Sequence, residues 1–591
     1  MRPLGTAGTP PASGSNVFLL ACAATVCAGI LGCRSSKGLP SPEALASLAK
    51  GGDEKPLDHG GPSVELGAEG PARFVSTLFN AFREEAAMDT VEFMDARYRT
   101  PGSKGFEEAL DRIEAELRLV GFGSREDLEL EILESPMEVP SWTARSGELR
   151  LFTSSGGESV LHAFDRPSSL DRCLLPANAP SADVRGPVCL TLADLKPGDI
   201  LVTETTLRRD TMLRAKNQGA VALVSASINS YNTDPSGRER HLDAIQFRSL
   251  DPSVGLPVAQ ISKRSLRAIE AAAEAGGAQL GLKAEVEFGE SSTRTIVATI
   301  VGEDRPDEVV ALSSHLEAPG ASDNASGAAG QLENALALAR VLTAGGFNRP
   351  SRSLAFIWGP ENQEATDWLE HQGRRPVAAV NAVMIGESVE KTGARPLLER
   401  YPDPGGLHTL APDEHTVWGS RDIDPSWLVP NGLSIIARCA MVDVSENVGG
   451  WKTFENPYEG GTDHERFITS GVPAVLFWHF TDFSFHTSLD RVNLVDGAEL
   501  KRMAVTALVT AMAIADPRPQ DLTRYLECVN RERVMRVRVA EEAQELALAE
   551  DWRTWSSGVR NWFRIECLGL QGKGNELPGV MESAYIKERD Q

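Results

Sequence analysis

The sequence predicts an α/β fold in which a mostly parallel mixed sheet is flanked by helices. After Thr293, short apolar runs that suit buried strands alternate with segments of helical spacing. Such alternation favours parallel pairing, with helices covering both faces of the sheet. The predicted strands cover 296–301, 309–312, 354–358, 379–385 and 473–478.

Helical patterns fill the intervals between these strands. Apolar residues recur at helical spacing from Ala325 to Ala339, directly after a strand. The other predicted elements are helices over 73–95, 104–120 and 500–514, and strands near 128–133 and 149–152. They place the N-terminal part of the sheet domain at 73–170 and its main part at 291–516.

Two further regions differ from this pattern. Between the two parts of the sheet domain, 171–290 reads as short βα units, which form either an inserted module or more of the main domain. Residues 517–591 are charged and helical, and predict a helical C-terminal extension. Its tryptophans Trp552, Trp555 and Trp562 are spaced like one buried face that packs on the main domain. The loop-rich stretch 393–458 predicts a lid or pocket wall.

Composition argues against two classes of partner. The 591 residues carry a formal net charge of −24. Nucleic-acid binding depends on Lys and Arg that displace counterions from phosphates, so no nucleic-acid partner is expected. The same repulsion applies to anionic lipid. A hydrophobic content of 41% is ample for packed cores, and the length suggests about three or four domains.

The N-terminus predicts a processed export signal. Arg2 precedes an apolar run over 17–32 that is short for a membrane span and suits a signal peptide. The small residues before Cys33 resemble the lipobox of bacterial lipoproteins, which implies lipidation of Cys33 and removal of the signal peptide before it. We therefore expect a lipid anchor in the bacterial cell envelope, with 34–72 as a flexible tether. A plain signal peptide or an uncleaved anchor is the alternative.

Cysteine usage permits disulfides in such a compartment. Sequence proximity suggests the pairs Cys173–Cys189 and Cys528–Cys567, although connectivity does not follow from sequence. No Cys-x-x-Cys motif or Cys/His cluster is present, so a cysteine zinc site is not expected.

Polar residues with metal-binding chemistry lie beside the predicted strands. His315 and Asp323 occupy the loop after strand 309–312, where open α/β sheets bind ligands. Three further segments adjoin strands and supply Glu361, Asp463 and His486. Two imidazoles, an aspartate and an unligated glutamate are what a hydrolytic zinc site requires.

The order of these segments resembles the bacterial zinc aminopeptidases of metallopeptidase family twenty-eight, in clan MH, whose relatives include glutamate carboxypeptidase and glutaminyl cyclase. The resemblance is carried in order by Arg97-Tyr-Arg-Thr-Pro-Gly-Ser103, His315-x-acid, Asp323-Asn-Ala-Ser-Gly327, Pro360-Glu361, Gly461-Thr-Asp-His464 and His486-Thr-Ser488. It implies a zinc exopeptidase-like fold and a peptide substrate. Region 171–290 is similar to the protease-associated (PA) domain, a small module inserted in many secreted peptidases.

The resemblance also implies roles for these residues. In the family, two zinc ions about 3.5–4 Å apart share a bridging aspartate, which corresponds to Asp323. His315 and His486 correspond to ligands of one ion each. Glu361 corresponds to the general base that takes the proton of the attacking water. Glu317 corresponds to the acid that orients the first imidazole, where the family usually has Asp.

Two positions depart from the family pattern. In the family, a glutamate usually follows the general base. This sequence has Asn362 at that position, and its neutral amide oxygen is a poorer zinc ligand than a carboxylate. The other metal carboxylate is replaced by Val383, which cannot bind zinc. We therefore expect one or two zinc ions with an incomplete ligand set. Residues near these gaps that are candidates to substitute, or to line the pocket, are Glu387, Glu364, Asp463 and His464.

Three functions remain open on this basis. The first is a lipoprotein aminopeptidase that hydrolyses N-terminal peptide bonds with metal-activated water. The second is a pseudopeptidase that binds peptides or an envelope partner through the same cleft, which the loss of two metal carboxylates favours. The third is glutaminyl cyclisation on the same fold with one zinc ion.

Overall fold

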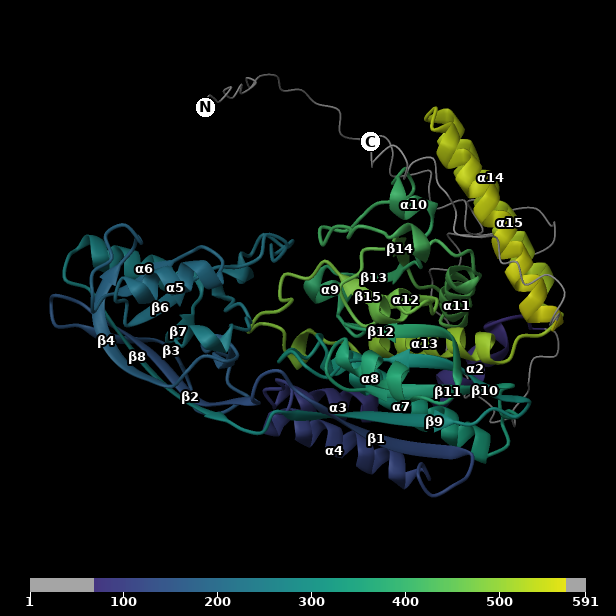
Figure 1. Ribbon diagram of the computed structural model, residues 1–591, viewed down its shortest axis with the longest axis horizontal. Coiled ribbons are helices and arrows are strands. Elements are labelled where there is room, and N and C mark those ends of the chain that lie inside the picture. The colour runs from purple at the N-terminus through teal and green to yellow at the C-terminus, as the bar shows by residue number, and fades with distance from the viewer. Residues whose placement is uncertain (1–67, 570–591) are drawn as a thin grey trace, which may run out of the picture. The chain divides into compact units, whose positions relative to one another are not determined.

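The main sheet has eight strands in the order β1-β9-β11-β10-β12-β15-β13-β14 (Figure 1). The computed structural model describes residues 68–569. The central strands of the main sheet pair in parallel. They are β11 (Arg352–Trp358), β10 (Arg305–Ser313), β12 (Arg375–Ala382) and β15 (Ala474–Phe480). The outer strands are β1 (Leu128–Pro136), β9 (Ser292–Ile300), β13 (Arg395–Glu399) and β14 (Phe454–Asn456). Antiparallel pairs join β1 to β9, β9 to β11 and β13 to β15. The predicted mostly parallel mixed sheet is confirmed.

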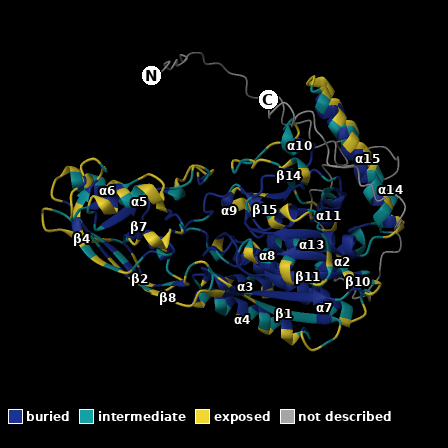
Figure 2. Ribbon diagram, viewed as in Figure 1, coloured by how far each residue is buried: buried dark blue, intermediate teal, exposed yellow. Residues whose placement is uncertain are grey.

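Helices flank this sheet as the sequence predicts. They are α2 (Ala72–Ala81), α3 (Glu84–Asp95), α4 (Lys104–Leu119), α7 (Ala325–Thr343), α8 (Gln363–His371), α9 (Val389–Thr392), α10 (Pro404–Leu407), α11 (Leu433–Asn447), α12 (His464–Thr469) and α13 (Gly497–Ala515). α7 and α13 are buried along most of their length, because small and apolar residues let them pack closely (Figure 2). The single helix expected over 73–95 is two helices. The chain is extended at Phe82 and Arg83, and the Arg83 N–H donates to Glu333.

A second sheet, with its own apolar core, is inserted between β1 and β9. Its order is β3-β2-β8-β4-β5-β6-β7. The strands are β2 (Trp142–Phe152), β3 (Glu158–Phe164), β4 (Ala182–Cys189), β5 (Ile200–Thr203), β6 (Ala222–Ser225), β7 (Val258–Gln260) and β8 (Gln279–Phe288), with helices α5 (Arg209–Asn217) and α6 (Lys263–Glu274). The sheet takes in β2 and β3, which precede residue 171. The PA-type nature of 171–290 stays a prediction.

The C-terminal extension is a pair of helices, α14 (Asp521–Glu542) and α15 (Leu546–Leu568). The predicted aromatic face is confirmed for Trp552 and Trp555, whereas Trp562 is only partly buried and packs against the same core. Trp552 and Trp555 are buried, and Trp555 stacks on Tyr401.

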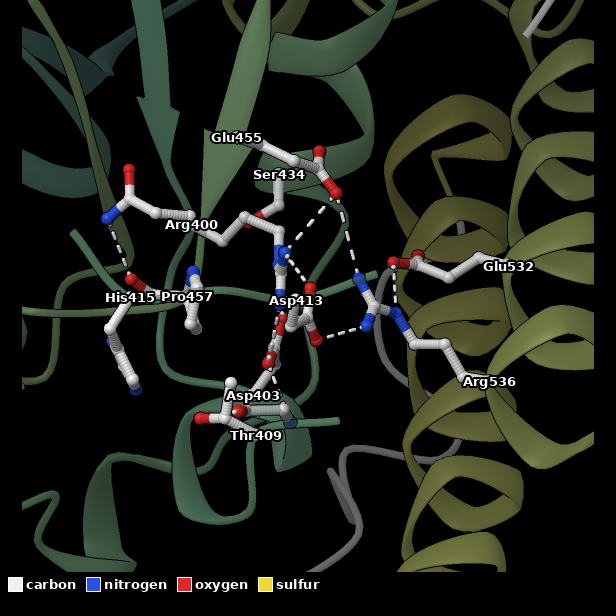
Figure 3. Close-up of polar contacts among 12 residues, drawn as sticks. Arg400, Asp403, Thr409, Asp413, His415, Ser434, Glu455, Pro457, Glu532 and Arg536 are labelled. Carbon is white, nitrogen blue, oxygen red and sulfur yellow. Dashed lines mark hydrogen bonds and ion pairs between the residues drawn. The ribbon is translucent and has the colours of Figure 1, made fainter. Parts of the chain in front are cut away.

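A buried charged cluster attaches this helix pair to the main domain (Figure 3). Arg400 donates to Asp403 at 2.7 Å and to Asp413 at 2.8 Å. Arg536 of α14 donates to the same Asp413 from the other side and to Glu532 at 3.1 Å. The side chains of Arg400, Asp413 and Arg536 are at most 4% exposed. Each charge is therefore paired, as burial requires.

The described cysteines are all free thiols, namely Cys173, Cys189, Cys439, Cys528 and Cys567. The expected pairings Cys173–Cys189 and Cys528–Cys567 are therefore wrong as the structure stands. Closeness in sequence was their only basis, whereas packing of α11 on α14 brings Cys528 to Cys439.

Several predictions fall on residues 1–67 and 570–591, which lie outside the described residues. They concern the signal peptide, the lipidation of Cys33, most of the tether and the end of the C-terminal extension. Among residues 68–569, no helix combines the length and apolar character needed to cross a membrane.

Candidate active site

The site begins where β10 ends. His315 follows that strand, and Asp323 precedes α7, so both lie at the edge where parallel strands leave the sheet. Both side chains are nearly fully buried. The structure thus brings the two residues of the central motif together.

Asn324 holds this loop in place. It caps α7 by accepting from the Gly327 N–H at 3.1 Å, and it also accepts from the Met384 N–H at 3.0 Å. Its amide donates to the His315 carbonyl at 2.9 Å. A Cβ at position 327 would lie 2.3 Å from the Asn324 Oδ1, which explains the glycine. One side chain therefore joins the ends of β10 and β12 to the start of α7.

Asp323 lies between the two imidazoles. Its Oδ2 is 2.8 Å from Nε2 of His486, and its Oδ1 is 3.8 Å from Nε2 of His315. Although burial raises the pKa of Asp323, the two histidines and Arg99 outweigh it, and the pKa is lowered. The carboxylate thus offers one oxygen to each imidazole.

Glu361 faces the same group from the end of β11. Its Oε1 is 3.8 Å from Nε2 of His315, and its side chain remains one-third exposed. Burial, opposed by His315 and reinforced by Asp463 and Asp323, raises its pKa. A carboxylate with a raised pKa is suited to accept and return a proton near neutral pH.

Glu317 supports both Glu361 and His315. Its Oε2 accepts the Glu361 N–H at 2.5 Å and lies 3.9 Å from Nδ1 of His315. Burial disfavours charge on His315, but Glu361, Asp463, Glu317 and Asp323 together raise its pKa to about 9. The site is therefore strongly electronegative and favours a cation.

Asn362 and Asp463 are joined by a hydrogen bond beside Glu361. Asn362 has a positive φ of 64°, and its N–H donates to Asp463 Oδ1 at 2.7 Å. Glu364, in the first turn of α8, is fully buried beside Asp463. Burial and the neighbouring carboxylates of Asp463 and Glu317 raise the pKa of Glu364 well above its usual range.

Val383 belongs to an apolar cluster, not to a polar shell. The buried members of this cluster are Val383, Met384, Leu397, Leu476, Trp478, Phe480 and Phe485. Tyr231 and Trp418 pack against it. The Trp418 contact places one residue of the expected lid or pocket wall next to the site.

The two remaining candidate substitutes have other partners. Glu387 is fully buried and accepts from Ser322 Oγ at 2.8 Å. His464 pairs with Glu399 at 2.9 Å, and that carboxylate also accepts two backbone N–H groups. His464 therefore belongs to the structural support of the loop before α12. Metal binding by Glu387, Glu364 or Asp463 stays a prediction.

The inserted region supports His486, a connection that sequence reasoning missed. The His486 carbonyl accepts the Phe247 N–H and the Gln246 side-chain amide, both at 2.7 Å. Asn232 donates to the Phe485 carbonyl at 2.8 Å. Phe485 stacks on the His486 ring with centroids 4.0 Å apart. No sequence pattern signals these contacts, because they join loops that lie more than two hundred residues apart in the sequence.

Sequence reasoning also missed the structural roles of Asp490 and Arg99, although both residues lie in segments that it had singled out. Asp490 accepts the N–H groups of Ser322 and Asp323 at 2.7 and 2.9 Å. It comes four residues after His486 in the same conspicuous segment. Arg99 donates to the Gly320 carbonyl at 2.7 Å and is fully buried, and it lies in Arg97-Tyr-Arg-Thr-Pro-Gly-Ser103, the first of the motifs that carry the resemblance.

The donor set fits one metal ion better than two. His315, Asp323 and His486 supply two imidazoles and a carboxylate, the set of many catalytic zinc sites. The buried Nδ1 of His315 has no hydrogen-bond partner, and Val383 offers no donor. Within residues 68–569, no group of three or more His, Cys, Asp or Glu is arranged closely enough to hold an ion. Binding one would require these side chains to close around it.

Comparison with known proteins gives structural matches of low identity. No curated protein matches the sequence. An aminopeptidase from Aneurinibacillus sp. strain AM-1 is 19% identical with a TM-score of 0.45, covering 75% of this chain and 96% of that one. BSAP, a zinc aminopeptidase from Bacillus subtilis, is 15% identical with a TM-score of 0.46, covering 72% and 94%. A Peptidase M28 precursor from Shewanella amazonensis SB2B is 18% identical with a TM-score of 0.49, covering 75% and 96%.

A sequence family supplies the firmer link. Residues 295–392 match the profile of Peptidase family M28. The matched segment contains His315, Asp323 and Glu361, whereas Asp463 and His486 lie outside it. The resemblance to metallopeptidase family twenty-eight that the motifs predicted is therefore confirmed over residues 295–392.

Proposed function

We propose that the protein is a zinc-dependent exopeptidase that removes the N-terminal residue from peptides. One observation carries the proposal: Asp323 presents an oxygen to each of two imidazoles while Glu361 faces the same group. Within this site, the acidic surroundings would also attract the positively charged amino terminus of a peptide.

Each residue has a defined task in this proposal. His315, Asp323 and His486 would hold a zinc ion, whose chemistry is to polarise the scissile carbonyl and lower the pKa of water. Glu361 takes the proton of the attacking water and returns it to the leaving amine. Glu317 fixes the Glu361 backbone through its accepted N–H and keeps the carboxylate aimed at the cleft.

The variant Glu361→Gln tests this assignment. It keeps the shape of the side chain but removes the basic oxygen, so kcat on aminoacyl anilides should fall by at least about 100-fold. The matched control is Glu370→Gln, an exposed position on α8, the helix that follows Glu361. Equal turnover by Glu361→Gln and the control would refute the assignment.

A second candidate is a peptide-binding protein without hydrolytic activity. Val383 and Asn362 favour it, since both stand where the family implies a metal carboxylate. Zinc content and chelator-sensitive hydrolysis separate the two candidates. The peptidase requires about one bound zinc per chain and loses activity with a chelator. The binding protein retains peptide affinity after the same treatment.

We also propose a lipid anchor at Cys33 in the bacterial cell envelope. The apolar run and the small residues before Cys33 support it. Fractionation of cells that produce the full chain tests the anchor. Cys33→Ser should move the protein from the membrane fraction to the soluble fraction.

A further inference from the structure

Two cysteines meet where the C-terminal helix pair docks on the main domain. Cys439 lies on α11 and Cys528 on α14, 89 positions apart in sequence, and their Sγ atoms are 3.9 Å apart. Cys439 is 5% exposed, whereas Cys528 is partly exposed. The pair is thus close enough to interact, and one of its two residues is partly exposed.

The charges around the pair differentiate the two sulfurs. The hydrogen bond from Cys439 is the largest effect that lowers the pKa of Cys528, and Arg524, Arg438 and Arg531 add to it. The same hydrogen bond, together with burial, raises the pKa of Cys439. An accessible thiolate beside a buried thiol is the arrangement in which one cysteine attacks an oxidant and the other resolves the product.

We propose that Cys439 and Cys528 are a redox modification site that closes to a disulfide and staples α14 to α11. The oxidant is a small-molecule or protein disulfide. The Cys528 thiolate attacks one of its sulfurs, forming a mixed disulfide and releasing one thiolate. Cys439 then loses its proton to solvent, attacks the Cys528 sulfur and expels the second thiolate. Two protein thiols are oxidised by two electrons, and the oxidant is reduced to two thiols.

The position of the pair gives the staple a structural consequence. Arg438 precedes Cys439 and bonds Glu455 and Glu532, two members of the charged cluster of Figure 3. The disulfide would therefore secure the same contact between helix pair and main domain that the buried ion pairs hold. Because it closes a long loop of chain, it should restrict the unfolded chain strongly.

Peptide mapping of the purified full chain tests the proposal. The reduced protein is incubated with oxidised glutathione, the remaining thiols are alkylated, and trypsin is added without reductant. Cleavage after Arg438 and Lys452, and after Arg524 and Arg531, isolates one cysteine in each peptide. We expect these two peptides as one disulfide-linked species that separates on reduction. Their recovery as alkylated or only glutathionylated peptides would overturn the proposal.

Serine variants give an independent readout. Oxidation should raise the thermal midpoint of the wild type by a few degrees. Cys439→Ser and Cys528→Ser should each lose this difference. The matched control, Cys567→Ser on the other helix of the pair, should keep it. A difference that persists in Cys439→Ser would show that oxidation acts elsewhere, and would contradict the staple.

Discussion

Two loops supply the candidate ligands, and they are held in different ways. The loop with His315 and Asp323 is fixed by side chains of its own domain, chiefly Asn324 and Asp490. The loop with His486 is fixed by Gln246 of the inserted region. The first loop is nearly fully buried, whereas the His486 side chain remains 36% exposed.

This difference indicates that the first loop contributes to the stability of the whole domain, whereas the second loop is the adjustable part of the site. Removing a support from the first loop leaves buried polar groups without partners, so the free energy of unfolding of the whole domain should fall. Removing a support from the second loop should chiefly affect the placing of one ligand. The His486 side chain is partly exposed, and segments with fewer buried contacts open more readily than a packed core.

The largest expected effect belongs to Asn324→Ala. It deletes the cap of α7 and leaves the Met384 N–H and the His315 carbonyl unpaired, which should cost roughly 2–4 kcal/mol of the free energy of unfolding. Urea denaturation measures it, with the exposed Asn493→Ala as control. A loss below about 1 kcal/mol would contradict the central role of Asn324.

A smaller and more local effect is expected for Gln246→Ala. The variant removes one of two donors to the His486 carbonyl, so zinc affinity should fall by about 10–100-fold. The free energy of unfolding should change by only about 1 kcal/mol. Zinc titration of the apoprotein and urea denaturation provide both numbers, with the exposed Gln218→Ala as control. If Gln246→Ala and the control Gln218→Ala lost zinc affinity to the same extent, the inserted region would have no specific role in supporting His486.

The smallest effect on activity is expected for His464→Gln. Its imidazole pairs with Glu399 and contacts neither loop's ligands, so kcat per folded molecule should stay within about twofold of wild type. The free energy of unfolding should fall, since the Glu399 carboxylate loses a buried partner. A collapse of kcat in the folded variant would place His464 in the catalytic group after all.

The fold was predictable where local pattern and packing agree. Strands 296–301, 309–312 and 354–358 are continuous apolar runs, and they form central or adjoining strands of the main sheet. The break at Phe82 and Arg83 was not predictable, because Glu333 stabilises it from more than two hundred residues away.

The site residues were likewise predictable only in part. His315, Asp323 and Glu361 follow strands in recognisable motifs, and the structure brings them together. His464 ends an equally conspicuous motif, yet its side chain pairs with Glu399. Gln246 lies in a segment without any motif. Its role depends on contacts between distant parts of the chain, which periodicity and spacing do not encode.

The charged cluster between the helix pair and the main domain also decides where the protein can be shortened. A chain that ends at Ala515 would retain the whole sheet but strip Asp413 of one of its two guanidinium partners. It would also expose Tyr401, which now stacks on Trp555. A chain that ends at Ala515 should therefore be less stable than the full chain, because α14 and α15 supply these buried contacts.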